Sequence, residues 1–164
     1  MPGLALLILI TVALGFEFIN GFHDTANAIA VSIHTGALSA GRAVALAAVM
    51  NLLGAFASEN VARTISGELI SAAIDEYTII AALIAAIIWN LFTWYLGMPA
   101  SSSHALIGAL IGASVVFTGS TDAVLWKNLV LKVVLPLFLC PPAGFAAGAL
   151  ASLFIKKENR IMQI

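Results

Sequence analysis

A run of uncharged, mostly apolar residues at Thr78–Gly97 leaves few folds open to this chain. As a helix it would be about 30 Å long, which matches the hydrocarbon core of a bilayer. Two further long runs, Leu4–Ile19 and Leu129–Ile155, are also predominantly apolar. The chain is 62% hydrophobic and 9% charged, against roughly 45–50% and 25% in soluble domains. We therefore predict an all-α integral membrane protein that crosses the cell membrane several times.

Composition also excludes several classes of function. The net charge of −1 leaves no basic field that would attract nucleic acid. The single cysteine, Cys140, can form neither an intrachain disulfide nor a cysteine-based metal site. We expect no bound metal and no cofactor. The lipid bilayer is the expected surrounding, and residues 1–164 are predicted to form a single transmembrane unit.

The first apolar run leads into a polar segment. On a helix, Asn20, Asp24 and Asn27 fall at positions i, i+4 and i+7 and therefore share one face. Glu17 and His23 border the same stripe. Ionisable groups at membrane depth cost several kcal/mol unless they are paired or hydrated, so this stripe indicates a water-filled cavity.

The apolar stretch that follows, Ala28–Leu38, would be only about 16 Å long as a helix and cannot span a bilayer alone. Gly21 allows a helix to open at the polar segment. We therefore predict a break in the polar segment, with Ala28–Leu38 as a half-helix. The alternative is an interfacial loop between two helices, where polar residues need no further explanation.

A second polar segment, Met98–His104, separates the long apolar run from a short one at Ala105–Phe117. Proline disfavours helix at the residue before it, so the first helix is expected to stop near Met98. Serine is a favoured N-cap, so a new helix is expected to start near Ser102 or Ser103. The alternative is an ordinary helix cap that binds no ligand.

The start of a helix exposes free backbone N–H groups and the positive end of the helix dipole. Beside these groups, the hydroxyls of Ser101, Ser102 and Ser103 would form a site for an oxyanion. Broken helices that meet near the centre of the bilayer are the usual way in which transporters build a substrate site. We predict that the stripe around Asp24 faces these serines in a hydrated pocket.

Histidine as a residue type titrates near neutral pH, so His23 and His104, which lie in these segments, are candidates to carry a coupling proton. Asn20 and Asp24, on the predicted stripe, complete the set of candidate coupling residues. The alternative for each histidine is a structural, hydrogen-bonded role.

Both polar segments resemble signatures of the inorganic phosphate transporter (PiT) family. The first reads Gly21-Phe-His-Asp-Thr-Ala-Asn-Ala28, and the second reads Pro99-Ala-Ser-Ser-Ser-His104. The resemblance implies that Asp24 and Asn27 belong to the site for substrate and coupling ion. It also implies that the three serines of the second segment bind phosphate.

The pair His23-Asp24 resembles the branch of this family that is coupled to protons or carries metal-phosphate, whereas sodium-coupled members more often have Asn before the Asp. Members of the family contain two inverted halves, each with both signatures. This chain has one copy of each and matches the N-terminal half. We therefore expect one repeat of an inverted-repeat transporter. The second half would come from sequence missing here, from a separate chain or from a homodimer.

The predicted function is symport of inorganic phosphate across the cell membrane, with this chain supplying half of the site. Three alternatives remain open at this point. The chain could transport another oxyanion such as sulfate, act as a membrane hydrolase through a Ser/His pair, or serve as a partner subunit that does not itself transport.

Overall fold

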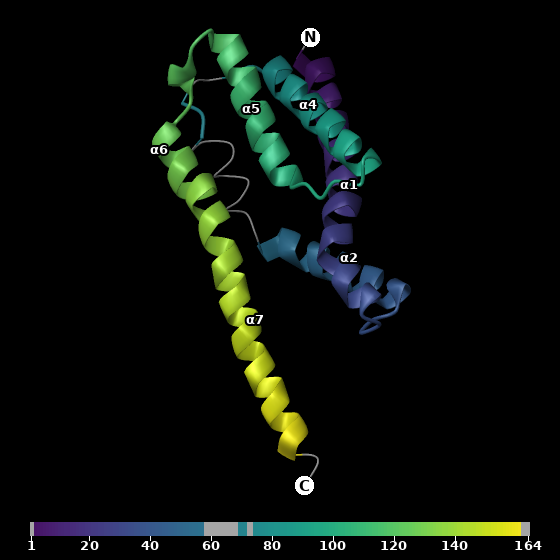
Figure 1. The fold of residues 1–164 in the computed structure, drawn as a ribbon. Helices are drawn as coiled ribbons and strands as arrows, with labels where there is room; N and C mark the ends of the chain where they lie inside the picture. Colours follow the sequence, from purple (N-terminus) through teal and green to yellow (C-terminus); the bar gives the residue numbers. More distant parts are fainter. Residues whose placement is uncertain (1, 58–68, 72–73, 162–164) are drawn as a thin grey trace. The chain divides into compact units, whose positions relative to one another are not determined.

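The computed structural model describes residues 2–57, 69–71 and 74–161 (Figure 1). Within these residues the regular elements are helices, with one isolated β-bridge between Ile70 and Val124. The chain divides into two compact units, Met1–Val124 and Leu125–Ile164. The elements are α1 (Pro2–His34), α2 (Ala40–Ala57), α4 (Glu76–Tyr95), α5 (Ser102–Thr118), η1 (Thr121–Ala123), α6 (Trp126–Leu129), η2 (Val130–Val134) and α7 (Leu135–Ile161).

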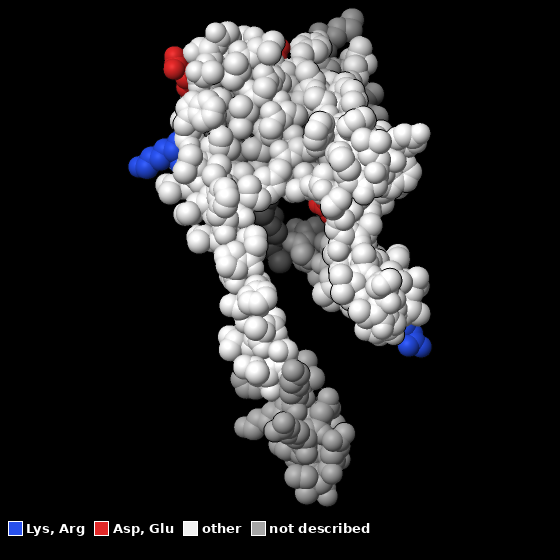
Figure 2. All heavy atoms as spheres, viewed as in Figure 1, with Lys and Arg blue, Asp and Glu red and all other residues white. Residues whose placement is uncertain are grey.

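Three helical stretches are long and apolar enough to cross a membrane: Gly3–His34, Glu76–Tyr95 and Trp126–Leu153. Helices α2 and α5 are apolar but shorter. Figure 2 shows a surface that is almost free of charged side chains over the described atoms. Large apolar side chains are exposed on every long helix, as expected of surfaces that face lipid. The prediction of an all-helical membrane protein is therefore confirmed.

Helix α1 corrects one prediction, because it runs through the first polar segment without interruption. Its 33 residues, Pro2–His34, include the stretch expected to break, and Ala28 onward is the end of α1 rather than a half-helix. The segment contains no proline, and a single glycine such as Gly21 costs a helix only about 1 kcal/mol. Polar side chains gathered on one face leave the backbone hydrogen bonds intact. The alternative of an interfacial loop is excluded for the same reason.

The break between α4 and α5 is confirmed, although its cause differs from the predicted one. Helix α4 ends at Tyr95, and Gly97 adopts a left-handed φ of 65°. The N–H of Met98 donates to Thr93 O at 2.9 Å and that of Gly97 donates to Trp94 O at 3.0 Å. This is a Schellman motif, which requires glycine at its left-handed position. The helix thus stops before Pro99 acts on it.

Helices α1, α4 and α5 pack together within the first unit. Their apolar core is centred on Phe16 of α1 with Leu83 and Ala86 of α4, and Leu106 and Ala109 of α5 pack against it. The core ends one turn before the polar residues of α1. The three helices therefore hold the polar stripe of α1 against the turn between α4 and α5.

The second unit is one long helical run from Trp126 to Ile161. Pro141 and Pro142 both lie inside α7, which continues past them. The irregularity lies earlier, where Val130–Val134 forms a π-helix. The two prolines remove N–H donors, yet the flanking turns keep their own hydrogen bonds, so the helix is not broken.

Candidate functional site

Ser102 is the point at which α1 meets the start of α5. Its side chain is fully buried, and its hydroxyl lies 2.5 Å from Asp24 Oδ2. The same hydroxyl also makes a hydrogen-bond contact with Oδ1 of Asn20. Since Asn20 and Asp24 are one turn apart on α1, both side chains reach the same hydroxyl. The stripe predicted on a helical α1 therefore does face the serine segment.

The hydroxyl of Ser102 can donate to only one of its two neighbours on α1. A serine has one O–H to donate, but the hydroxyl has two acceptor oxygens beside it. Both contacts are favourable if the amide of Asn20 is turned so that its nitrogen donates to Ser102, which then donates to Asp24.

His23 is buried between α1 and α4. Its Nδ1 lies 3.5 Å from Asp24 Oδ1, and its Nε2 lies 3.4 Å from Thr93 Oγ1. The imidazole therefore extends the cluster from Asp24 to α4. Its ring orientation is set by two polar partners, one on each side.

The remaining residue of the predicted stripe, Asn27, also reaches the second segment. Its Nδ2 donates to the backbone oxygen of Ala100 at 3.4 Å. Asn20, Asp24 and Asn27 thus all contact residues 100–102. A hydrogen bond of 3.3 Å from Asn51 Nδ2 to Thr25 Oγ1 ties α2 to α1.

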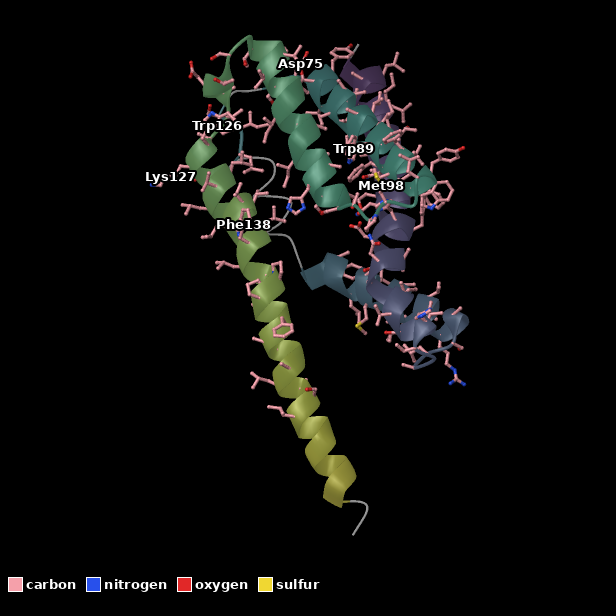
Figure 3. All side chains as sticks on the ribbon, in the orientation of Figure 1. Asp75, Trp89, Met98, Trp126, Lys127 and Phe138 are labelled. Atoms are coloured by element: carbon pink, nitrogen blue, oxygen red, sulfur yellow. The ribbon has the colours of Figure 1, made fainter. Side chains whose placement is uncertain are left out.

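The three serines do not point into one site. Ser101 caps α5, because its hydroxyl accepts from the N–H of His104 at 3.4 Å and lies 2.8 Å from His104 Nδ1. Ser101 and His104 line a separate cavity of about 480 Å³ with Trp89, which is labelled in Figure 3. Ser103 is exposed. Of the predicted residues, Ser102 lies in the Asp24 cluster, whereas His104 and Ser103 lie outside it.

A larger cavity of about 1030 Å³ lies between α1 and α2. Glu17, Asn20 and Asp24 line one side, and Asn51 lines the other. Among its described lining residues are two carboxylates and no Lys or Arg, so this cavity favours cations over anions. The hydrogen-bond donors for an anion lie instead at the start of α5, in its free backbone N–H groups.

Two buried polar residues of α4 were missed in the sequence. Thr93, almost fully buried, contacts His23, and Asn90 is completely buried one turn earlier. The available signal was that polar residues three apart within an apolar membrane helix are rarely there by chance.

Comparison with known proteins identifies the family. The profile of the phosphate transporter family matches residues 20–163. This chain belongs to that family. Membership in a family of transporters indicates a transport protein rather than a membrane hydrolase.

Several curated relatives are similar to this member of the phosphate transporter family over most of its length. The probable low-affinity inorganic phosphate transporter of Bacillus subtilis is 47% identical over 95% of the chain, and that of Mycobacterium tuberculosis strain H37Rv is 46% identical over 94%. The low-affinity inorganic phosphate transporter PitA of Escherichia coli is 42% identical over 89%. The chain spans 49%, 37% and 32% of these relatives. No solved structure matches.

Proposed function

We propose that this chain forms part of a secondary transporter that moves inorganic phosphate across the cell membrane. The observation that supports this most directly is the meeting of the α1 stripe with the start of α5, at the contact between Ser102 and Asp24. The names of the relatives, which are inorganic phosphate transporters, point to the same substrate.

Phosphate would bind at the start of α5. As the first two helical residues, Ser102 and Ser103 have backbone N–H groups with no acceptor inside the helix. The helix dipole adds a positive field there, and α5 is 17 residues long. The hydroxyl of Ser102 would supply a further hydrogen bond, while Asn27 holds the preceding turn through Ala100. The hydroxyls of Ser101 and Ser103 would have to turn toward the substrate to add theirs.

Asp24 gives the site a mechanism for coupling. In the present arrangement the carboxyl group of Asp24 contacts Ser102 at the start of α5, where the phosphate would bind. A proton or cation on Asp24 would lower the repulsion between this carboxylate and phosphate. His23, in contact with Asp24, and Asn20, beside Ser102, are the neighbours placed to respond. His104, bound to Ser101, would respond through the cap of α5.

A second half completes the transporter in this proposal. The chain spans about half or less of the relatives named above, and the large cavity opens along one side of α1. We propose that residues 1–164 are one repeat and that the second repeat, or a second copy, covers this side in a multi-pass assembly. Protons, sodium ions or metal-phosphate remain candidates for the coupled species.

Uptake of labelled phosphate into proteoliposomes tests the proposal, with the chain reconstituted alone and with its complementary half supplied. We expect saturable uptake in the second case, and inhibition by unlabelled phosphate. Competition with sulfate separates phosphate from other oxyanions, because helix N–H groups and hydroxyls do not choose between tetrahedral anions. Absence of uptake under both conditions would reject the proposal.

A further inference from the structure

Asn90 is the one described residue whose buried side-chain polar atoms lack a hydrogen-bond partner. Its side chain is completely buried, and neither Nδ2 nor Oδ1 has a partner among the described residues. A buried amide without partners destabilises a fold, and an apolar residue of similar shape would avoid that cost. Such a group calls for a bound water molecule or ligand as its partner.

Helical spacing places Asn90 beside the proposed site. Ala86, Asn90 and Thr93 fall at i, i+4 and i+7 and share one face of α4. At one end of this face Ala86 packs in the core with Phe16, and at the other end Thr93 contacts His23. Asn90 therefore faces the turn of α1 that lies between Phe16 and His23.

That turn of α1 contains Asn20, four residues after Phe16 and three before His23. Asn20 contacts Ser102, the residue at the start of α5. The carboxamide of Asn90 thus belongs to the same polar layer as the Asn20–Ser102 pair and the His23–Thr93 pair.

We propose that Asn90 and Thr93 are positioning residues of the phosphate site, and that Asn90 acts through a buried water molecule. A single water both donates and accepts, so it satisfies the amide nitrogen and the amide oxygen together. Through this water Asn90 holds the Asn20–Ser102 pair in place. Thr93 orients the imidazole of His23 directly. The inference rests on the proposed phosphate transport.

Two measurements on Asn90→Leu test the role of the amide. Leucine has the same branched shape and no polar atom, and its larger side chain would take the place of the water molecule. We therefore expect the unfolding temperature in detergent to equal that of wild type or to exceed it. In proteoliposomes with the complementary half, we expect the ratio of maximal rate to half-saturating phosphate concentration to fall about fivefold, as for one lost hydrogen bond. A gain in stability with a loss of transport is not expected of a packing residue.

Ser114→Ala is the matched control. Ser114 is also fully buried, but its hydroxyl donates to Leu110 O at 2.7 Å. It lies about three turns along α5 from Ser102. We expect transport by this variant to equal that of wild type. A comparable loss of transport in both variants would mean that any buried polar group matters, and would overturn the assignment to Asn90.

Thr93→Val tests the contact with His23. Valine keeps the shape and removes the hydroxyl, so we expect the pH profile of phosphate uptake to shift, whereas Thr93→Ser, which keeps the hydroxyl, should restore it. An unchanged profile in Thr93→Val would overturn the role of Thr93.

The outcomes separate this inference from the proposed function. If Asn90→Leu takes up phosphate as well as wild type does, the role of Asn90 is overturned, whereas the proposed phosphate transport is not. A strong loss of stability in Asn90→Leu would also overturn it, since the amide would then have a structural partner. No uptake by wild type would reject phosphate transport and this role together.

Discussion

The hydroxyl of Ser102 lies 2.5 Å from a carboxylate oxygen of Asp24, although 78 positions separate the two residues in the sequence. The contact joins the middle of α1 to the first residue of α5. It places a negative group of the protein where an anionic substrate would bind. Substrate and coupling ion would then act on one carboxylate, which gives them a physical link.

Replacement of Ser102 by alanine should weaken phosphate transport more than replacement of any exposed serine. The change removes a hydrogen bond to a charged group, which corresponds to a loss of about tenfold in transport efficiency. Initial rates of labelled phosphate uptake measure it. Ser152→Ala, on an exposed part of α7, serves as the control, and equal rates in the two variants would contradict the proposed site.

Asp24→Asn should uncouple transport from the driving ion. The amide keeps the size of the side chain but holds no charge and takes up no proton. We expect phosphate uptake by this variant to depend less on pH and on an imposed proton or sodium gradient than uptake by wild type. Uptake with and without each gradient provides the measurement. A gradient dependence equal to that of wild type would show that another residue couples the ion.

Gly97→Ala should destabilise the turn that sets the position of Ser102. Gly97 has a φ of 65°, which costs a residue with a Cβ about 1–2 kcal/mol. A Cβ there would meet no atom within 4 Å, so the backbone conformation alone decides the effect. Gly112→Ala is the control, because that glycine is helical and equally uncrowded. The unfolding temperature in detergent should fall for Gly97→Ala and should stay the same or rise for Gly112→Ala.

The stability of the first unit should decrease as pH falls in the acid range because of Asp75. This residue caps α4 from outside the span, accepting from the N–H of Thr78 at 2.8 Å, with the hydroxyl of Thr78 at 2.5 Å. The side-chain and backbone hydrogen bonds from Thr78 lower the pKa of Asp75 below its usual value of 3.8. The contribution of Asp75 to the free energy of unfolding is therefore complete above pH 3.8 and is lost as pH falls through the lowered pKa.

Two variants separate the charge of Asp75 from its role as a cap. Asp75→Asn keeps an oxygen that caps the helix, so its unfolding temperature should no longer respond to titration of this group. Asp75→Ala removes the cap and should unfold at a lower temperature at neutral pH. The same acid response in Asp75→Asn and wild type would assign the effect to another carboxylate.

Most of the candidate site could be anticipated from spacing along the chain. Asn20, Asp24 and Asn27 share a face because a helix repeats every 3.6 residues, and the structure keeps α1 helical through all three. The start of α5 at Ser102 followed from the capping preference of serine. The predicted break in α1 was wrong, because a polar stripe and one glycine do not outweigh a continuous ladder of backbone hydrogen bonds.

The sequence alone determined that this chain is a helical membrane protein and which residues lie on its polar faces, because those properties depend on composition and on local periodicity. Only the tertiary structure decided which of those faces meet. It selected Ser102 over Ser103 for Asp24, paired His104 with Ser101, and buried Asn90 and Thr93 beside the site. These choices depend on how α1, α4 and α5 pack, which local sequence does not encode.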